Sequence, residues 1–569
     1  MARAAGLLLL ACFFGPQTLG EEETSAPPHA DLVILGGRVW IGRADPVAQR
    51  SPDIGPTSVA VRGERIVAVG DEVAVRAFVG PQTRVLEARG RRIIPGITDS
   101  HTHLVSGGLQ LDRLALRDVP DRAAFVTAVA AAARKTQPGQ WLLGGRWSVE
   151  SWSDPQSPRK EWIDPATEKV PVFLSRMDGH QALVNSAALE MAGIDRAGPA
   201  DPVGGEIERD PASREPTGIL KESAMELVRR HIPPTGSKER YQALLRAMRH
   251  ANELGITSVH DMSDPADLEV FDRARGEGRL KVRITAYVQT TEWAEWLEKI
   301  QRFPADDQFR IAGFKGYMDG SLGSRTAYMH RPFSDAGPQS PYPRGQLTAF
   351  AAGPGFLDSI ALAHRSGVQV AIHAIGDEAN HLLLDAYQAA QQSAERRDAR
   401  HRVEHAQHLM IEDIPRLASL GVVASMQPFH KADDGRYAEV GLGSERLEGS
   451  YAFRRLLYAG VLLCFGSDWP VVTLNPFAGL EAAVTARTVQ GDVWLPTHSL
   501  DVEEALGAYT VSPPRAIHRE HELGTIEPGK LADLVMLEDD PLSIPSERLG
   551  EVRVAATILG GRVVYQRSD

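Results

Sequence analysis

The hydrophobic and polar positions along this chain follow two periods in turn. Short runs rich in Val, Ile and Phe predict β-strands, and longer stretches in which apolar residues recur every three or four positions predict α-helices. Their alternation is typical of βα units, which build a parallel sheet. The runs that predict strands are 92–98, 170–176, 256–261, 282–288, 310–316, 368–374, 402–406, 422–427 and 461–467.

These runs number one more than an eight-stranded barrel can hold. The run at 170–176 lies in a segment of about 106–250 that is rich in Trp, Pro and Gly. We therefore expect an α/β fold, a β/α barrel in which 106–250 is inserted after the first strand. The clearest helical stretches are 123–135, 238–254 and 380–397.

The two ends of the chain repeat one motif, ILGGRV, at 34–39 and again at 558–563. In each copy two β-rich runs flank Gly-Gly, which is a hairpin signal. An alternating pattern over 58–71 lies near the first copy, and the apolar run at 529–537 lies near the second. We therefore expect strands from both termini to share one small domain. The predicted bounds are 31–91 and 516–567 for this domain and 92–515 for the barrel with its insertion.

The longest apolar run lies at the start of the chain. Arg3 supplies one positive charge, about eleven apolar residues follow, and an acidic segment begins at Glu21. This pattern predicts a secretory signal peptide over 1–20 and an exported protein, periplasmic or secreted. The run is too short for the ~20 apolar residues of a membrane-spanning helix. Lipid attachment at Cys12 is the alternative interpretation of the same segment.

Composition excludes several classes of protein. With 43% hydrophobic residues the chain can bury a sizeable core, so it is not disordered. The net charge is −12, and no cluster of Lys and Arg is long enough to follow a phosphate backbone, so nucleic acid is not an expected partner. After removal of the signal peptide one cysteine remains, Cys464. It lies in the apolar run VLLCFG, and we expect it to be a small buried residue.

Residues that carry chemistry stand where several predicted strands end. The active site of a β/α barrel is built at the carboxyl ends of the strands, and imidazole is the commonest metal ligand. Lys315 ends one run and Asp468 follows the last one. The histidines at such ends are His101, His103, His373 and His405. One His-x-His pair alone would more often be structural, but the whole ordered set predicts a metal site.

Further motifs surround this set. They are PGITDSHTHL (95–104), DGHQALVNSAAL (178–189), PTGILKE (216–222), FKGYMDGSLGSRTA (314–327), IHAIGD (372–377), VEHAQ (403–407), SMQPFH (425–430) and GSDWPV (466–471). Over about 31–567 the chain resembles the metal-dependent amidohydrolase superfamily, and within it the amidohydrolase 3 branch, which includes N-substituted formamide deformylase. The resemblance implies a distorted (β/α)8 TIM barrel and a small β-sandwich domain built from both termini.

The resemblance also implies a role for each member of the set. His101 and His103 would bind one divalent metal ion. His373 and His405 would bind a second ion or orient the substrate. The expected metal is Zn²⁺, with one or two ions in each chain. Lys315 would be carboxylated by CO2 and bridge the metals, because a neutral amine can take up CO2 and burial beside cations favours the neutral form.

Asp468 would bind metal weakly and take the proton from the attacking water. Simpler interpretations stay open for two residues. Lys315 could form an ion pair with Asp319 inside the barrel, and Asp468 could be an N-cap or turn residue in GSDWP. Asp99 is expected to hydrogen-bond the backbone or a ligand histidine, as acids behind metal sites do.

Several other residues are candidates for contact with the substrate. Three histidines end apolar runs or loops that face the same rim, and a histidine packed in the core is the alternative for each. Three residues of the insertion could line the substrate pocket. The candidates are His180, His260, His430, Arg146, Trp147 and Trp152.

Together with these residues, the resemblance implies a hydrolase of non-peptide carbon–nitrogen bonds that acts on a small amide, N-acyl or N-formyl compound by metal-activated water. A deaminase is the closest alternative, and Lys315 argues against it because deaminases of the superfamily lack that lysine. A lactone or ester hydrolase on the same barrel is a further alternative. A non-catalytic ligand-binding or regulatory barrel is disfavoured, since a degenerate site would have lost a member of the set. The oligomeric state is not predicted.

Overall fold

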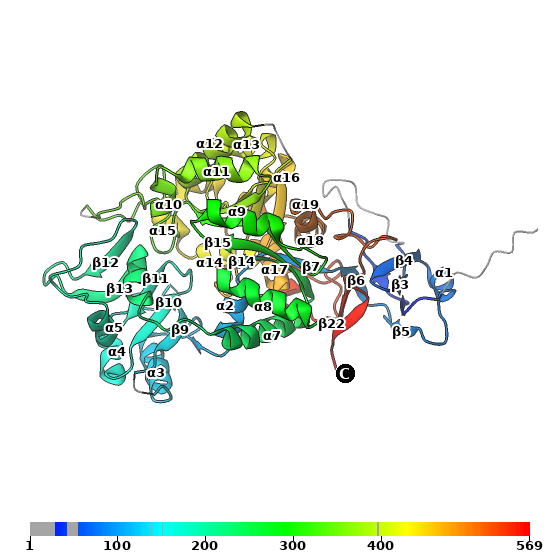
Figure 1. Cartoon of the computed structure of the whole chain (residues 1–569), viewed down its shortest axis with the longest axis horizontal. Helices are drawn as coiled ribbons and strands as arrows, with labels where there is room; N and C mark the ends of the chain where they lie inside the picture. Colours follow the sequence, from blue (N-terminus) through cyan, green and yellow to red (C-terminus); the bar gives the residue numbers. More distant parts are fainter. Residues whose placement is uncertain are drawn as a thin grey trace, which may run out of the picture.

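An eight-stranded parallel sheet forms the centre of the molecule, with one further sheet on one side and two on the other (Figure 1). The predicted signal peptide over 1–20, with Cys12, lies outside the described residues. In Figure 1 the insertion lies at the left of the barrel, and the strands from the two termini lie at the right. The computed structural model describes residues 29–42, 55–137, 139–150, 152–338, 340–394 and 398–568.

The central sheet is a nearly closed barrel, which confirms the predicted fold class and the positions of its strands. Neighbouring strands are parallel throughout. Where the first and last strands meet, the backbone N–H of Asp468 donates to the carbonyl O of His101 at 2.6 Å. In order round the barrel the strands are β7 (Ile97–Thr102), β14 (Ile256–Ser263), β15 (Arg283–Gln289), β16 (Phe309–Tyr317), β17 (Gln369–Ala374), β18 (Arg402–His405), β19 (Val423–Met426) and β20 (Leu462–Phe465).

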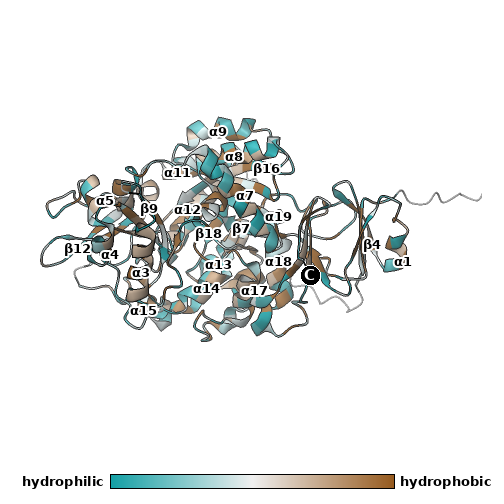
Figure 2. Ribbon diagram, turned by 90° about the horizontal axis from the view of Figure 1, so that it is seen from below, coloured by the Kyte–Doolittle hydropathy of each residue, from teal (hydrophilic) through white to brown (hydrophobic). Residues whose placement is uncertain are grey.

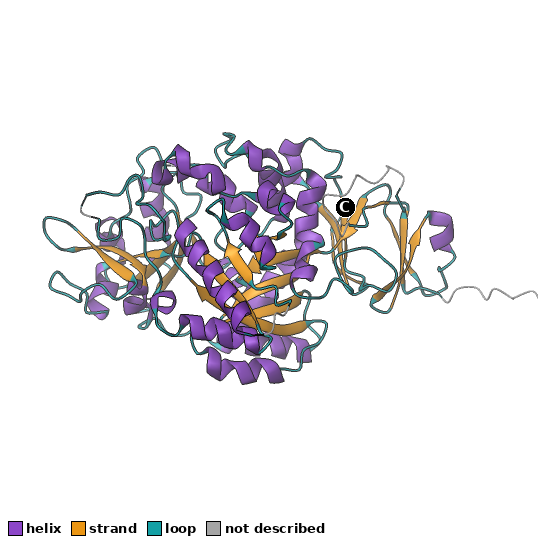
Figure 3. Ribbon diagram, turned by 90° about the horizontal axis from the view of Figure 1, so that it is seen from above, coloured by secondary structure: helices purple, strands orange, loops and turns teal. Residues whose placement is uncertain are grey.

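Helices surround the barrel strands (Figure 3). The three stretches predicted to be helical are α3 (Arg122–Ala133), α7 (Ser237–Glu253) and α12 (Asp377–Ser393). None of the helices in the described ranges is both long enough and apolar enough to cross a lipid bilayer. The other helices along the barrel part of the chain are α2 (Leu104–Gln110), α8 (Pro265–Gly276), α9 (Trp293–Arg302), α10 (Ala349–Ala352), α11 (Phe356–Arg365), α13 (Asp413–Ser419), α14 (Pro428–Asp434), α15 (Ala438–Leu442), α16 (Phe453–Tyr458), α17 (Pro476–Thr485), α18 (Val502–Thr510) and α19 (Ser512–Ala516).

The insertion folds around a six-stranded sheet of its own, and its strands all lie within the predicted segment of about 106–250. The run at 170–176 forms one of these strands and not a barrel strand, as predicted. The strands, in sheet order, are β12 (Gly205–Arg209), β13 (Pro216–Glu222), β11 (Gln181–Val184), β10 (Val172–Arg176), β9 (Leu142–Trp147) and β8 (Leu114–Ala115). Besides α3, the helices here are α4 (Lys160–Thr167), α5 (Ser186–Met191) and α6 (Glu226–Arg229).

Two sheets built from the chain ends pack on a common apolar core. Figure 2 shows hydrophobic residues along their strands, and more hydrophilic ones on outer helices such as α8 and α9. The first sheet is β4 (Arg65–Gly70), β3 (Ser58–Arg62), β1 (Leu32–Leu35) and β5 (Arg84–Glu87), with α1 (Glu72–Arg76) beside it. The second joins both termini and is β2 (Arg38–Val39), β6 (Arg92–Pro95), β21 (Leu534–Leu537), β22 (Val554–Leu559) and β23 (Arg562–Gln566).

The repeated ILGGRV motif forms a hairpin at one end of the chain only. In the second copy Gly560 and Gly561 both have positive φ, at 51° and 74°, and connect antiparallel strands β22 and β23. The hairpin predicted for the first copy is wrong, because β1 pairs with β3 and β5 while β2 pairs with β6 of the other sheet. Partners elsewhere in the chain satisfy the backbone groups that a hairpin would have paired.

Candidate metal centre and substrate cavity

A cavity of about 570 Å³ lies at the rim of the barrel, where the strands have their carboxyl ends. Its wall includes side chains of the barrel and of the insertion, among them Arg146 and His180. All members of the predicted set line it: His101, His103, Lys315, His373, His405 and Asp468. Residues far apart in the sequence therefore meet at one site.

Asp468 lies at the centre of this site. Its Oδ1 is 3.4 Å from Nε2 of His101 and 3.2 Å from Nε2 of His103. Asp99 holds the loop of Asp468 against β7, since its carboxylate accepts the backbone N–H groups of His101 and Ser467 at 3.1 and 2.9 Å. Asp99 thus binds backbone, as predicted. The side chain of Asp468 faces the imidazoles, and no helix in the described ranges has it as a side-chain cap. Its backbone does form a turn, as the alternative interpretation expected, since its carbonyl O accepts the N–H of Val471 at 2.8 Å.

A buried ion pair between Glu404 and Arg402 orients the ring of His101. Nδ1 of His101 lies 2.6 Å from Oε2 of Glu404, and Oε1 of Glu404 accepts Nε–H of Arg402 at 2.6 Å. Burial alone would raise the pKa of Glu404, but Arg402 lowers it well below its usual range. The charged Glu404 keeps the ring proton on Nδ1 and leaves Nε2 for a cation. We did not predict this pair, although alternate residues of RVEH share one side of a strand.

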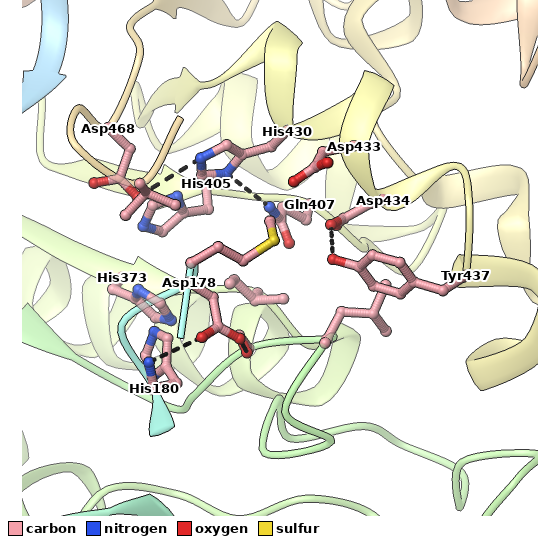
Figure 4. Close-up of a pocket in the computed structure, with 16 residues that line it drawn as sticks. Asp178, His180, His373, His405, Gln407, His430, Asp433, Asp434, Tyr437 and Asp468 are labelled. Carbon is pink, nitrogen blue, oxygen red and sulfur yellow. Dashed lines mark hydrogen bonds and ion pairs between the residues drawn. The ribbon is translucent and has the colours of Figure 1, made fainter. Parts of the chain in front are cut away.

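A second group of possible ligands also includes Asp468, and Figure 4 shows His405 and His430 of this group beside its carboxylate. Nε2 of His430 is 3.8 Å from Oδ2 of Asp468, and the rings of His405 and His430 are stacked with centroids 5.9 Å apart. Nδ1 of His405 contacts Oε1 of Gln427 at 2.7 Å. Nδ1 of His430 contacts Nε2 of Gln407 at 3.2 Å. In both rings Nε2 is therefore the nitrogen left for a ligand.

His373 lies beside this second group. Its ring centroid is 4.5 Å from that of His405, and its Nε2 contacts the carbonyl O of Gly320 at 3.0 Å. Nδ1 is therefore the nitrogen of His373 that remains for a ligand. The three-residue group contains His405, His430 and Asp468. His430 was predicted to contact the substrate. It lies beside His373 and His405, the residues predicted to bind a second metal ion or orient the substrate.

Lys315 is buried in the cavity wall, with 1% of its surface exposed. In the described part of the chain its Nζ has no hydrogen-bond partner, and burial lowers the pKa of Lys315 to about 8. The alternative ion pair with Asp319 is wrong. The carboxylate of Asp319 instead accepts backbone N–H groups of three residues, Tyr328, Ile375 and Gly376.

These side chains fit a divalent cation. Nε2 of His101 and Oδ1 of Asp468 are buried and have no hydrogen-bond partner among the described residues. An unpaired buried polar group costs about 1–3 kcal/mol, and a bound cation would offset that cost. Two sets of ligand atoms each lie within 4.8 Å of one another, those of His101, His103 and Asp468 and those of His405, His430 and Asp468.

Known proteins share the sequence and the fold that build this site. A model of the family described as "Amidohydrolase family" matches residues 84–565. The chain belongs to the amidohydrolase family. This amidohydrolase is 36% identical over 555 residues to Protein LONG AFTER FAR-RED 3 of Arabidopsis thaliana, and the match covers 94% of this chain and 92% of that protein.

Further similarity supports the assignment. The amidohydrolase is 28% identical over 529 residues to N-substituted formamide deformylase of Arthrobacter pascens, and the match covers 90% and 95% of the two chains. The crystal structure of an uncharacterized metal-dependent hydrolase from Pyrococcus horikoshii OT3 matches with a TM-score of 0.70 and 25% identity, covering 90% of this chain and 99% of that one. The predicted family is confirmed, and the protein is a metal-binding hydrolase that acts on carbon–nitrogen bonds.

Two of the other predicted residues of the amidohydrolase line its cavity. Nδ1 of His180 lies 3.0 Å from Oε2 of Glu222. Burial alone would lower the pKa of His180, but Glu222 raises it to about 9, so the ring is protonated at pH 7. Arg146 also stands in the cavity wall. Both residues are therefore within reach of a substrate.

His260, Trp147 and Trp152, which were also predicted as substrate contacts or pocket residues, do not stand in the cavity wall that the described residues form. His260 is fully buried beneath the site, where its Nδ1 accepts a hydrogen bond from Nη1 of Arg402 at 2.7 Å. Trp147 donates Nε1–H to the carbonyl O of Leu174 at 2.9 Å, inside the core of the insertion. Trp152 packs in the same core. Burial of these indole rings stabilises the insertion and leaves no surface for the cavity.

Proposed function

We propose that this amidohydrolase cleaves the amide bond of a small N-acyl or N-formyl compound at a centre that holds one or two Zn²⁺ ions. The observation that carries the proposal is that two groups of possible ligands share the carboxylate of Asp468. Imidazole and carboxylate ligands suit Zn²⁺. The formamide deformylase relative supports an N-formyl or N-acyl substrate.

The ligand atoms define where the ions would be held. The first would lie between His101, His103 and Asp468, and the second would lie near His405. When bound, such an ion polarises a carbonyl group and lowers the pKa of water to about 7. The protein contributes the position of the donors and a cavity that holds the amide against them.

Asp468 is placed to move the proton of the reaction. Burial alone would raise the pKa of Asp468, but His101 and its neighbours hold it well below its usual range. The side chain is therefore a carboxylate that can accept a proton from the attacking water. It would then donate that proton to the nitrogen of the departing amine, so that the enzyme ends in its starting state.

We also propose that Lys315 carries a carbamate. The neutral Nζ would attack the carbon of CO2, so that an N–C bond forms as one C=O π bond opens and one proton leaves the nitrogen. The carbamate shares a single negative charge between two oxygens, which would serve as metal ligands. The supporting observation is that Nζ is buried in the cavity wall without a hydrogen-bond partner among the described residues.

Replacing the lysine tests this second proposal. Lys315→Ala should lose activity and about half of the bound metal, and high concentrations of acetate or formate should restore part of the rate by supplying oxygen ligands. Metal analysis, intact mass and the hydrolysis rate are the measurements. Lys431→Ala is the matched control, because Lys431 is also buried but donates to the carbonyl O of Leu495 at 3.1 Å. A fully active, fully metallated Lys315→Ala enzyme would show that the lysine is structural.

A hydrolysis screen tests the proposed function itself. Purified, metal-loaded protein is offered N-formyl and N-acyl amines, lactones, esters and ring amines, with Asp468→Asn as the negative control. Release of free amine and acid from the amides is the expected result. Ammonia from ring amines alone would indicate a deaminase, and turnover of lactones or esters alone would indicate the other hydrolase class. No turnover of any compound would favour a binding protein.

We propose, in addition, that the protein is exported through residues 1–20. The pattern of one positive charge, an apolar run and an acidic segment supports this. N-terminal sequencing of the mature protein should find cleavage near Gly20. A lipid-modified Cys12 would establish the alternative, and an intact Met1 on protein inside the cell would contradict export.

A further inference from the structure

Outside the metal centre, most charged side chains of the cavity wall are paired. One acid of the wall, Asp319, is held instead by backbone N–H groups. Among the described residues of the wall, Arg146 stands apart from this pattern. The pairs are Asp178 with Arg176, Glu222 with His180, and Glu226 with Arg229.

Arg146 brings a guanidinium group to the cavity without a carboxylate partner. Its hydrogen bond runs from Nη1 to the carbonyl O of Met177 at 3.3 Å, and within the described ranges no carboxylate lies at ion-pair distance from it. Burial lowers the pKa of Arg146 to about 10, so the group is still protonated at pH 7. The charges of Asp468 and Asp178 partly oppose this lowering, but neither carboxylate is in ion-pair contact with Arg146. A partly buried cation without a carboxylate in contact is costly, and an anionic ligand that binds it directly would offset that cost.

The backbone directs this side chain away from the insertion core. Gly145 of β9 pairs with Ser175 of β10, and the next pair joins Trp147 to Arg176. Arg146 is thus the extra residue of a β-bulge, and it has a positive φ of 58°. Bulges near active sites re-aim a side chain, and such a backbone conformation is strained in a non-glycine residue. Here Trp147 enters the core while Arg146 faces the cavity.

Two glycines make this bulge possible. A Cβ at Gly144 would lie 2.4 Å from the carbonyl O of Leu114, and a Cβ at Gly145 would lie 2.5 Å from that of Ser175. Their φ angles are 131° and 104°, which favour glycine. Strands β8, β9 and β10 therefore approach one another closely, and this contact fixes the backbone conformation at Arg146.

We propose that Arg146 binds a carboxylate group of the substrate, so that the substrates are N-acyl or N-formyl amino acids or similar amides with a carboxylate near the scissile bond. This inference rests on the proposed function, since it describes the other end of the molecule whose amide lies at the metal centre. A carboxylate matches the guanidinium because its two oxygens accept two parallel N–H bonds. A dianionic phosphate matches less well, because Asp178 and Glu222 also line the cavity.

Matched substrates test the assignment. N-formyl and N-acetyl derivatives of an amino acid are compared with those of the amino alcohol, in which CH2OH replaces the carboxylate. Wild-type enzyme should cleave the acid with a kcat/KM at least about tenfold higher than the alcohol. Arg146→Met should lower kcat/KM for the acid by about 10–10²-fold, mainly through KM, and lower that for the alcohol much less, so that the preference for the acid is lost. Arg146→Lys should recover part of the loss.

Arg229→Met is the matched control, because Arg229 lines the same cavity but is paired with Glu226. Arg229→Met should leave kcat/KM unchanged for both the acid and the alcohol. If wild-type enzyme cleaves neither compound, the proposed function fails. If it cleaves both equally well, the proposed function stands and the role of Arg146 is overturned. Should Arg146→Met fail to fold, the preference of wild type and the behaviour of Arg146→Lys still decide the question.

Discussion

The site depends on side chains that use one polar atom for the protein and keep another for a ligand. His101 gives Nδ1 to Glu404 and keeps Nε2, and His405 gives Nδ1 to Gln427 and keeps Nε2. Each such bond fixes the tautomer and the direction of the free nitrogen before any ligand arrives. Asp468 completes the arrangement, since its two oxygens face histidines of two different groups.

The role of Asp468 makes the sharpest prediction at this scale. Asp468→Asn keeps the shape of the side chain but cannot accept the proton of water, so kcat should fall by about 10²–10⁴-fold. Metal content should fall less than in the His101→Ala/His103→Ala double variant, and the melting temperature should stay close to that of wild type. The measurements are kcat, metal content and melting temperature. A stable, metallated variant with a near-native kcat would contradict the proposed mechanism.

His180 predicts a pH dependence. Its pKa is raised from 6.5 to about 9 in the folded protein. The protonated ring therefore stabilises the fold fully below pH 6.5, by up to about 3 kcal/mol, and this contribution is lost as the pH rises through 9. His180→Gln should lower the melting temperature more at pH 6 than at pH 9.5.

His330→Gln is the control for this pH series. His330 also contacts an acid, Glu378, at 2.7 Å, but 63% of its side chain is exposed. Its substitution should change the melting temperature little at either pH. An equal effect of His180→Gln at both pH values would contradict the role given to the ion pair with Glu222.

At the scale of elements, close pairing of barrel strands sets the positions of the candidate ligands. Gly313 of β16 lies opposite Gln369 of β17, and the two strands carry Lys315 and His373 further along. A Cβ at 313 would lie 1.7 Å from the carbonyl O of Gln369. The strands approach this closely only because residue 313 has no side chain.

Gly313→Ala should therefore push β16 and β17 apart. We expect a loss of stability of at least about 1–3 kcal/mol, the usual cost of overpacking, together with a loss of bound metal. Melting temperature and metal content are the measurements. Gly276→Ala is the control, since a Cβ there meets nothing within 4 Å. If both variants melt like wild type, the close contact at Gly313 does not limit the spacing of the strands.

At the scale of the whole molecule, an ion held by His101, His103 and Asp468 would tie the first barrel strand to the loop after the last. Removal of the metal with a chelator should lower the melting temperature, because an ion at 100 times its dissociation constant stabilises the fold by about 2.7 kcal/mol. In the His101→Ala/His103→Ala double variant the chelator should cause a smaller shift. Thermal unfolding with and without chelator is the measurement. A melting temperature that the chelator leaves unchanged in wild type would contradict a metal contribution to stability.

The sequence by itself determined what depends on local pattern. Runs of apolar residues gave the barrel strands, and polar residues at the ends of those runs gave the residues that line the cavity, because strands of one barrel end at one rim. Cys464 is fully buried, as its apolar run predicted. These features follow from the period of each segment and need no knowledge of what lies opposite.

Only the tertiary structure decided which side chains meet across the barrel. Three features depend on which side chains the nearly closed barrel directs to its interior. They are the ion pair of Glu404 with Arg402, the place of His430 beside Asp468 and the burial of His260. The bulge that separates Arg146 from Trp147 depends on the register between β9 and β10. A shift of one residue in register moves a side chain to the other face, and the register is set by partners distant in the sequence.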